Sequence, residues 1–243
     1  MIICTVLTGT KYTYEDVNKL YRGLKNNTTI DFDFLCYTDH IYFHKLRAGG
    51  DFEPGIIFKP LEENGKKLQW YKLDFFKKDF VDHEDIIVMD IDLDIVGNVD
   101  FLFDDYKGFV GSHRWWWRWR EDKATNPFAL SGTVYKFKNG EHQIVVDTFE
   151  KDIKHWEEYF IKNGTTKGPV NGEQHFVQKV LVDNNIPCSY FPEKHIIKWH
   201  KDDFTTQLKL EKDYQKWSGN LYIDYMDEED WHPDIRIIHY AGS

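Results

Sequence analysis

Cysteine is scarce in this chain. Its 243 residues include three cysteines, Cys4, Cys36 and Cys188, which lie far apart in the sequence. No two of them have the spacing of a metal site or of a redox motif. The pattern argues against a metal-binding or redox role for the cysteines and favours buried thiols in a protein from a reducing compartment.

The sequence also lacks an excess of positive charge. It has 31 lysines and arginines against 41 aspartates and glutamates, which is a formal net charge of −10. Sequence-independent binding to nucleic acid or to an anionic membrane needs a positive surface. We therefore expect no nucleic-acid partner. An anionic substrate would need local help from a bound divalent ion and a few placed cations.

Long apolar runs and internal repeats are absent as well. No run approaches the roughly 20 apolar residues of a membrane-spanning helix. The first residues, 1–7, contain no basic side chain of the kind that opens a signal peptide. We expect a cytoplasmic, soluble protein without a membrane span.

The chain is rich in apolar and aromatic residues, arranged in alternating strand and helix patterns. They make up 41% and 17% of the sequence, which is enough for a large core. We predict strands over 2–7, 32–38, 86–89, 108–113 and 131–137, and helices after Thr13, over 69–81, over 141–162 and after Gly172. This alternation predicts an α/β fold with a mixed, mainly parallel central sheet flanked by helices. The charged stretch 201–230 is interpreted as a surface excursion of a single domain, 1–243.

The most informative pattern is an apolar strand that ends in two carboxylates. Residues 86–89 read Ile-Ile-Val-Met, which suits a strand buried on both faces, although periodicity alone also allows a short buried helix. Asp90 and Asp92 follow, and side chains two apart on a strand point the same way. Both would project beyond the carboxyl end of the strand, where open α/β sheets bind ligands. The pair predicts a Mg²⁺ or Mn²⁺ site, and the alternative is ordinary solvation of a strand end.

The acidic pair belongs to a longer segment, which reads Met-Asp-Ile-Asp-Leu-Asp-Ile-Val-Gly-Asn-Val-Asp-Phe-Leu-Phe over residues 89–103. It resembles the D-x-D segment of GT-A-fold glycosyltransferases, particularly the glycogenin-like and related bacterial family 8 type, which ends in N-[IV]-D-x-L-F. The spacing to Asn98 selects Asp90 and Asp92 and leaves Asp94 as an extra carboxylate. The resemblance implies a GT-A-like domain with a Rossmann-like nucleotide-sugar-binding half, 1–105, and an acceptor and sugar half, 106–243.

The resemblance also implies an activity. It is the metal-dependent transfer of a sugar from a nucleotide diphosphate, expected to be a UDP-sugar, to a carbohydrate or other hydroxyl acceptor. In such enzymes the D-x-D segment, here Asp90, Ile91 and Asp92, contacts the donor and the metal. Similarity to family 8 implies retention at the anomeric carbon. An inverting route stays open, because it would need only one carboxylate as a general base.

A tight glycine turn follows the first predicted strand. By resemblance, the nucleotide base and ribose lie beside this turn and the tyrosines after it; the residues are Thr8, Gly9, Thr10, Tyr12 and Tyr14. A tyrosine there would stack on uracil, or both would be half-buried aromatic residues at a helix entry. Asp39, at the end of strand 32–38, would accept a hydrogen bond from base or ribose, or would cap a loop.

Two blocks resemble the parts of the family that contact the donor sugar and phosphates. Lys72, with Leu73, matches a K-L pair whose lysine reaches the donor, and a cation there would stabilise the leaving nucleotide. The block Ser-Gly-Thr-Val that begins at Ser131 matches N-S-G-V. Leu130 stands where the asparagine is usual, which puts one sugar contact in doubt.

Two more blocks complete the resemblance. Gly-Glu-Gln at 172–174 matches G-D-Q, so that Glu173 and Gln174 would be catalytic residues facing the reacting sugar. The alternative for Glu173 is a cap at a helix amino end. The segment 237–242 follows V-I-H-F-x-G, in which His239 would be the third metal ligand and Gly242 would contact the donor. The family usually continues to a lysine three residues later, whereas this sequence ends at Ser243.

Four tryptophans follow strand 108–113 without a counterpart in the family; they are Trp115, Trp116, Trp117 and Trp119. Sugar rings stack on aromatic rings, so the segment could be a platform for the acceptor. The alternative is a loop packed on its own protein or at a homodimer interface.

Two rival functions remain. A haloacid-dehalogenase-type phosphohydrolase also has an apolar-D-x-D strand, but it expects Thr or Val where Asp94 stands and a strand near the amino terminus. A non-catalytic carbohydrate-binding or nucleotide-sugar-binding relative is suggested by Leu130, by Glu173 in place of Asp and by the absent lysine.

Replacing Trp116 and Trp119 with alanine tests the platform interpretation. We expect acceptor-dependent turnover to fall about tenfold or more, because each aromatic contact is worth about 0.5–1.5 kcal/mol. Initial rates at varied acceptor concentration, with thermal unfolding as the control, measure this. Unchanged turnover and unchanged stability would rule the platform out, and a loss of stability alone would favour the packed loop.

Overall fold

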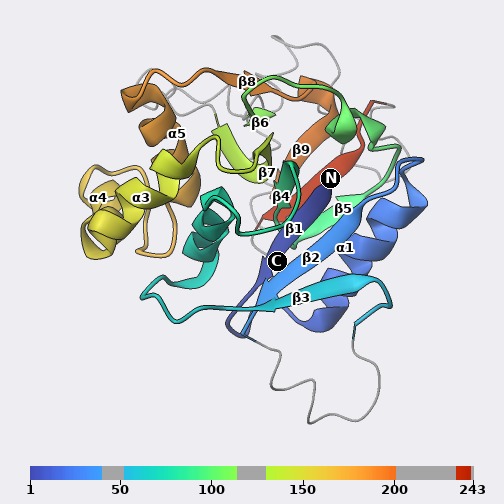
Figure 1. Cartoon of the computed structure of the whole chain (residues 1–243), viewed down its shortest axis with the longest axis horizontal. Coiled ribbons are helices and arrows are strands. Elements are labelled where there is room, and N and C mark those ends of the chain that lie inside the picture. Colours follow the sequence, from blue (N-terminus) through green and yellow to red (C-terminus); the bar gives the residue numbers. More distant parts are fainter. Residues whose placement is uncertain (40–51, 114–129, 201–233, 242–243) are drawn as a thin grey trace.

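The computed structural model describes residues 1–39, 52–113, 130–200 and 234–241. Strands form a central sheet in the order β3-β2-β1-β4-β7-β6-β8 and a smaller sheet in the order β5-β10-β9 (Figure 1). The strands are β1 (Ile2–Leu7), β2 (Asp33–Thr38), β3 (Ile56–Pro60), β4 (Asp85–Met89), β5 (Leu93–Ile95), β6 (Phe109–His113), β7 (Leu130–Lys138), β8 (Cys188–Tyr190), β9 (Ile196–His200) and β10 (Ile237–Ala241).

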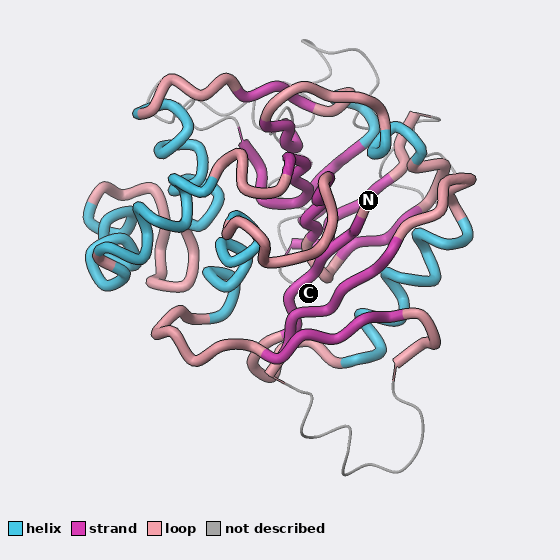
Figure 2. Tube along the Cα trace, viewed as in Figure 1, coloured by secondary structure: helices cyan, strands magenta, loops and turns pink. Residues whose placement is uncertain are grey.

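Helices lie on both sides of the central sheet. Figure 1 shows α1 on one side and the group α3, α4 and α5 on the other, and Figure 2 shows the strands as a layer between them. The helices are α1 (Tyr14–Asn26), α3 (Gln143–Lys151), α4 (Ile153–Lys162) and α5 (Glu173–Asp183), with 3-10 helices η1 (Leu68–Phe76), η2 (Asp100–Phe103) and η5 (Glu193–His195). The predicted α/β class is therefore confirmed.

The central sheet changes direction next to β4. Strand β1 pairs in parallel with both β2 and β4, and β2 pairs in parallel with β3. On its other side β4 pairs antiparallel with β7, in a register that sets Met89 opposite Val134. The sheet is mixed and mainly parallel, as predicted, and Asp90 follows the strand at which the pairing changes from parallel to antiparallel.

Strand β4 is buried on both faces, which explains its unbroken apolar run. Ile86 and Val88 belong to the core under η1, α3 and α5, whereas Ile87 and Met89 belong to the core under α1 and the small sheet. All four side chains are fully buried. The interpretation as a strand is confirmed, and the short buried helix is excluded.

Some predicted boundaries were wrong. The helix expected over 69–81 is the 3-10 helix Leu68–Phe76, and the one expected over 141–162 is two helices. Asp152 separates them, because its side chain accepts a hydrogen bond from the amide of His155 and starts α4 anew. The helix predicted after Thr13 is confirmed as α1, and a capping box of Thr13 with Asp16 starts it. Strands β3, β5, β8 and β9 were not predicted, and β3, β5 and β8 have at most one buried side chain each, which leaves little apolar pattern in the sequence.

The Asn-Val-Asp tail of the acidic segment has a structural role. Asn98 and Asp100 hydrogen-bond each other through side chain and backbone, and Asp100 also accepts hydrogen bonds from Thr28 and Thr29 after α1. Val99, between them, is fully buried. The tail therefore anchors the loop after β5 to the end of α1.

A buried ion network holds η1 between β2 and α3. Lys66 and Asp74 have fully buried side chains with Nζ and Oδ1 3.0 Å apart. Glu150 of α3 lies 2.5 Å from Lys66 Nζ, and Lys77 contacts both carboxylates. The Tyr37 hydroxyl of β2 donates to Asp74. The network fixes the helix that carries Lys72.

The three cysteines are free thiols, and burial raises the pKa of each, that of Cys188 to about 11. Cys4 and Cys36 are fully buried, as predicted, whereas Cys188 is half-buried. Among the described residues, no helix combines the length and the apolar character that a membrane crossing requires.

Removing the charge of Asp74 tests the ion network. Asp74→Asn leaves Lys66 and Lys77 with one carboxylate in a buried setting, and breaking such a pair costs about 3–5 kcal/mol of unfolding free energy. Urea unfolding measures the loss. The control Glu158→Gln breaks the exposed pair with Lys162 and should change stability little. Equal effects of the two substitutions would contradict the importance of the buried network.

Candidate functional site

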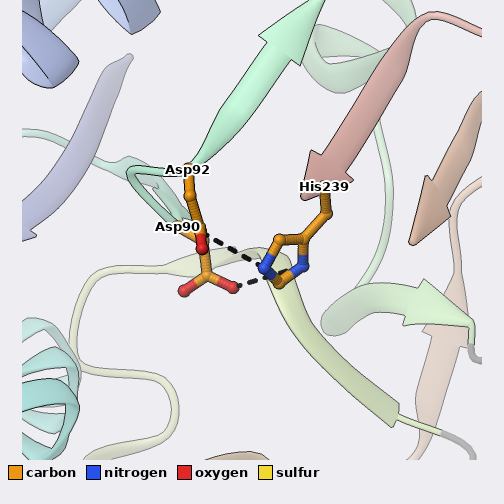
Figure 3. Close-up of side chains that lie close together, drawn as sticks. All are labelled: Asp90, Asp92 and His239. Carbon is orange, nitrogen blue, oxygen red and sulfur yellow. Dashed lines mark ion pairs between the residues drawn. The ribbon is translucent and has the colours of Figure 1, made fainter. Parts of the chain in front are cut away.

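Asp90, Asp92 and His239 meet where the two sheets adjoin (Figure 3). Asp90 continues β4 by one residue, since its amide donates to the carbonyl oxygen of Thr133 on β7 at 3.0 Å. Asp92 lies immediately before β5. His239 lies within β10, which pairs antiparallel with β5 and sets His239 opposite Leu93. The imidazole is thus held within a paired strand, next to the segment that carries Asp92.

The three side chains have the spacing of a metal site. His239 Nε2 lies 3.2 Å from Asp92 Oδ1, and His239 Nδ1 lies 3.8 Å from Asp90 Oδ2. One ligand atom from each residue can be chosen so that all lie within 4.8 Å of one another. Ligands of one octahedral ion at roughly 2.1 Å are about 3 Å apart when adjacent and about 4.2 Å apart when opposite. Two carboxylates and an imidazole suit Mn²⁺, so the residues present fit a divalent ion.

Lys72 brings a positive charge to this cluster. Its Nζ lies 2.5 Å from Asp90 Oδ1 and 3.6 Å from Glu173 Oε2, and it donates to the carbonyl oxygen of Gly132 at 2.9 Å. Burial opposes the charge, but the two carboxylates outweigh it and raise the pKa of Lys72 above its ordinary value. The ammonium is therefore charged at neutral pH.

Glu173 and Gln174 open α5 beside the same cluster. Glu173 is buried, and that burial, with a smaller contribution from Asp90, raises its pKa to about 7 against the opposing effect of Lys72. Gln174 Oε1 accepts from the Gly132 amide at 2.8 Å. A Cβ at Gly132 would come within 3.1 Å of Glu173 Oε2, so glycine permits this close approach. Five sequence blocks thus converge on one site.

Tyr12 contacts a predicted metal ligand. Its hydroxyl donates to Asp92 Oδ2 at 2.5 Å and accepts from Lys11 Nζ at 2.6 Å. Burial raises the pKa of Asp92, but hydrogen bonds from His239 and Tyr12 outweigh it and lower that pKa below its ordinary range. Burial and Asp92 raise the pKa of Tyr12, so the hydroxyl stays protonated as a donor. Stacking of Tyr12 on a base stays a prediction.

The glycine turn after β1 is held by Asp39. Its Oδ2 accepts from Thr8 Oγ1 at 3.2 Å and from the Gly9 amide at 3.4 Å, so Asp39 does cap a loop. Gly9 has φ +72°, and a Cβ there would come within 2.9 Å of Leu68 on η1. The turn therefore packs against the helix that carries Lys72, and only glycine fits without strain.

The remaining predicted residues have mixed placements. Ile91 is buried in the core, so only its backbone can face a ligand. Ser131 is buried with its hydroxyl 2.8 Å from Thr133 Oγ1. Thr10 is exposed, and the Tyr14 ring packs on Phe52. The expectations that fall on Gly242 and on the tryptophans at 115–119 lie outside the described residues.

Sequence reasoning missed one residue of the site. Thr133 Oγ1 lies 2.9 Å from Nδ1 of His239, yet no role was predicted for it. The available signal was alternation, since Ser131 and Thr133 are two residues apart in a predicted strand and so place two hydroxyls on one face.

Glu173→Gln tests the environment of the buried carboxyl. The folded pKa of about 7 lies above the ordinary value of 4.5, so the stability that Glu173 contributes is fully present below pH 4.5 and is lost as the pH rises through 7. We expect the native chain to lose about 3 kcal/mol relative to Glu173→Gln across this window. Urea unfolding with chelator present measures both curves. Parallel curves would contradict the raised pKa.

No protein-family model and no curated protein matches the sequence. Solved structures match its fold. The galactosyltransferase LgtC, in complex with donor and acceptor sugar analogs, is 13% identical with a TM-score of 0.56 over 100% of this chain and 87% of LgtC. The glycosyltransferase GlyE of Streptococcus pneumoniae TIGR4 is 13% identical with a TM-score of 0.59 over 98% of this chain and 54% of GlyE. The chain thus spans about half of GlyE, and its fold is that of GT-A-type glycosyltransferases.

Proposed function

We propose that this protein is a metal-dependent glycosyltransferase that moves a sugar from a nucleotide diphosphate, with UDP as the expected nucleotide, to a hydroxyl acceptor. One observation carries the proposal. Asp90, Asp92 and His239 form a cluster with metal-ligand spacing, and a charged, buried Lys72 contacts that cluster, at the carboxyl end of β4 in a GT-A-type fold. Open α/β sheets bind ligands at this position.

The three ligand side chains would hold Mn²⁺ or Mg²⁺. When bound there, such an ion supplies positive charge to the diphosphate of the donor. Lys72 adds a second positive charge at the place where the leaving nucleoside diphosphate gains negative charge. Because this charge is already in position before the reaction, no rearrangement is needed to use it. Local cations of this kind are needed because the chain as a whole carries a net charge of −10.

The protein side chains would also position the donor. Tyr12 holds Asp92 through its hydroxyl, and Gln174 holds the Gly132 amide, so both sides of the cluster are braced. Glu173 and Gln174 would face the sugar. The residues come from both predicted halves, with Lys72 and Asp90 from 1–105 and Glu173 and His239 from 106–243. We therefore place the reaction between these halves, with the acceptor on the second.

Retention at the anomeric carbon stays our expectation, based on the resemblance to family 8 enzymes. Glu173 is a poor candidate for the base of an inverting route. Its carboxyl is buried and contacts Lys72, so it has little access to an acceptor from solvent. The anomeric configuration of the first product, read by NMR before mutarotation, distinguishes the two routes.

Release of nucleoside diphosphate from a panel of nucleotide sugars, with Mn²⁺ or with chelator, tests the function. We expect release from one donor, abolished by chelator and reduced about 10²-fold or more by Asp92→Asn, because the charge that organises the site is lost. Asp94→Asn is the matched control. Asp94 is two residues away, pairs with Lys19 and does not belong to the cluster, so activity should stay near the native value.

Other outcomes identify the rivals. Release of orthophosphate from a simple phosphomonoester would favour a phosphohydrolase. Metal-dependent binding of nucleotide sugars without release or transfer would favour a non-catalytic binding protein. An equal loss in Asp92→Asn and Asp94→Asn would show that the total negative charge of this segment, rather than the cluster of Asp90, Asp92 and His239, sets the rate.

A further inference from the structure

Two hydroxyl side chains lie buried next to His239, one of the three predicted metal ligands. Thr133 is fully buried and Ser131 nearly so, and both belong to β7. Their oxygens are 2.8 Å apart, and Thr133 Oγ1 lies 2.9 Å from His239 Nδ1. The three groups form a continuous chain of hydrogen bonds from the sheet interior to the imidazole.

Thr133 contacts two of the three ligands. Its side chain contacts His239, and its carbonyl oxygen accepts the amide hydrogen of Asp90 at 3.0 Å. The second contact follows from the antiparallel β4–β7 register, in which Met89 lies opposite Val134, so that Asp90, after Met89, meets Thr133, before Val134. One residue thus links β7 to ligands from β4 and β10.

The two ring nitrogens of His239 have different neighbours. Nδ1 is hydrogen-bonded to Thr133, whereas Nε2 lies 3.2 Å from Asp92 Oδ1. A histidine that binds a metal through one nitrogen normally has its other nitrogen hydrogen-bonded, which fixes the ring orientation. A hydroxyl can donate or accept, so Thr133 can hold the ring whichever nitrogen carries the proton.

We propose that Thr133, supported by Ser131, is a positioning residue that fixes the imidazole of His239 and presents Nε2 as the metal-binding atom. The inference rests on the proposed metal centre. It goes beyond that centre by assigning the hydroxyl chain a part in metal affinity. Valine at this position has nearly the shape of threonine but would leave Nδ1 buried without this partner, which is costly.

The test compares Mn²⁺ binding by full-length variants without nucleotide, measured from the electron paramagnetic resonance signal of free Mn²⁺. We expect Thr133→Val to raise the Kd about 10–100-fold, as is typical when a partner of a ligating histidine is lost. Thr133→Ser keeps the hydroxyl and should restore affinity to near the native value.

Thr5→Val is the matched control. Thr5 is as fully buried as Thr133, but its hydroxyl donates to the Met89 carbonyl oxygen and contacts no ligand side chain. It should therefore lower thermal stability without weakening Mn²⁺ binding. If Thr5→Val weakens binding as much as Thr133→Val, or if Thr133→Ser fails to rescue, a general loss of packing explains the effect and the proposal is wrong.

A second readout needs no metal. In the chelator-treated chain, ¹⁵N NMR of the His239 ring, assigned by its loss in His239→Asn, should show shifted ring nitrogens in Thr133→Val and native-like shifts in Thr133→Ser and Thr5→Val. Unchanged shifts in Thr133→Val would overturn the positioning role. If Thr133→Val does not fold, Ser131→Ala carries the test and should weaken Mn²⁺ binding by a few-fold, and unchanged affinity would overturn the proposal.

The two failures are distinguishable. If the native chain binds no Mn²⁺, the proposed metal centre is wrong and the role of Thr133 falls with it. If the native chain and Thr133→Val bind Mn²⁺ equally well, the metal centre stands and only the positioning role is refuted.

Discussion

The antiparallel pairing of β10 with β5 is the constraint on which the site depends. Asp90 and Asp92 lie on both sides of Ile91, which is buried in the core, and β5 begins directly afterwards. Because β10 pairs with β5, His239 arrives beside residues almost 150 positions earlier in the chain. The ladder continues to Ile237, opposite Ile95, and the amide of Val96 donates to the carbonyl of Arg236 at 2.8 Å. A slip of one residue would turn the imidazole to the other face of the sheet.

Charge balance is the second requirement of this site. The ammonium of Lys72 contacts the carboxyl groups of Asp90 and Glu173, and the nearby carboxylate of Asp92 adds further negative charge. Burial of one acid in such company raises its pKa, which is what Glu173 shows, while hydrogen bonds keep Asp92 ionised. The excess of negative charge is what a divalent cation would neutralise. The negative charge of the site and the type of its ligating side chains therefore both favour a divalent cation.

The structure around the site holds in place the segments that carry the site residues. The network of Lys66, Asp74 and Glu150 fixes η1, and the Asn98–Asp100 turn anchors the loop after β5 to the end of α1. Several motif residues therefore have structural duties, and the short motif is a mixture of ligands and supports. Asn98 and Asp100 can therefore belong to the D-x-D segment without contacting the candidate metal ligands Asp90, Asp92 and His239.

The local sequence pattern alone predicted the fold class, the strands β1, β2, β4, β6 and β7, and the pair Asp90 and Asp92. It was sufficient because apolar runs and a spacing of two residues can be read from neighbouring positions in the sequence. The resemblance to GT-A enzymes added Lys72, Glu173, Gln174 and His239 as candidates, and the structure brings them to one place. The tertiary structure alone decided what depends on contacts between distant segments. These are the ion network around Asp74, the Tyr12 hydroxyl on Asp92, the capping of the Gly9 turn by Asp39, and Thr133 behind His239. A hydrogen bond between residues 106 positions apart has no period and no spacing in the sequence, so only the register of β7 and the pairing of β10 could reveal it.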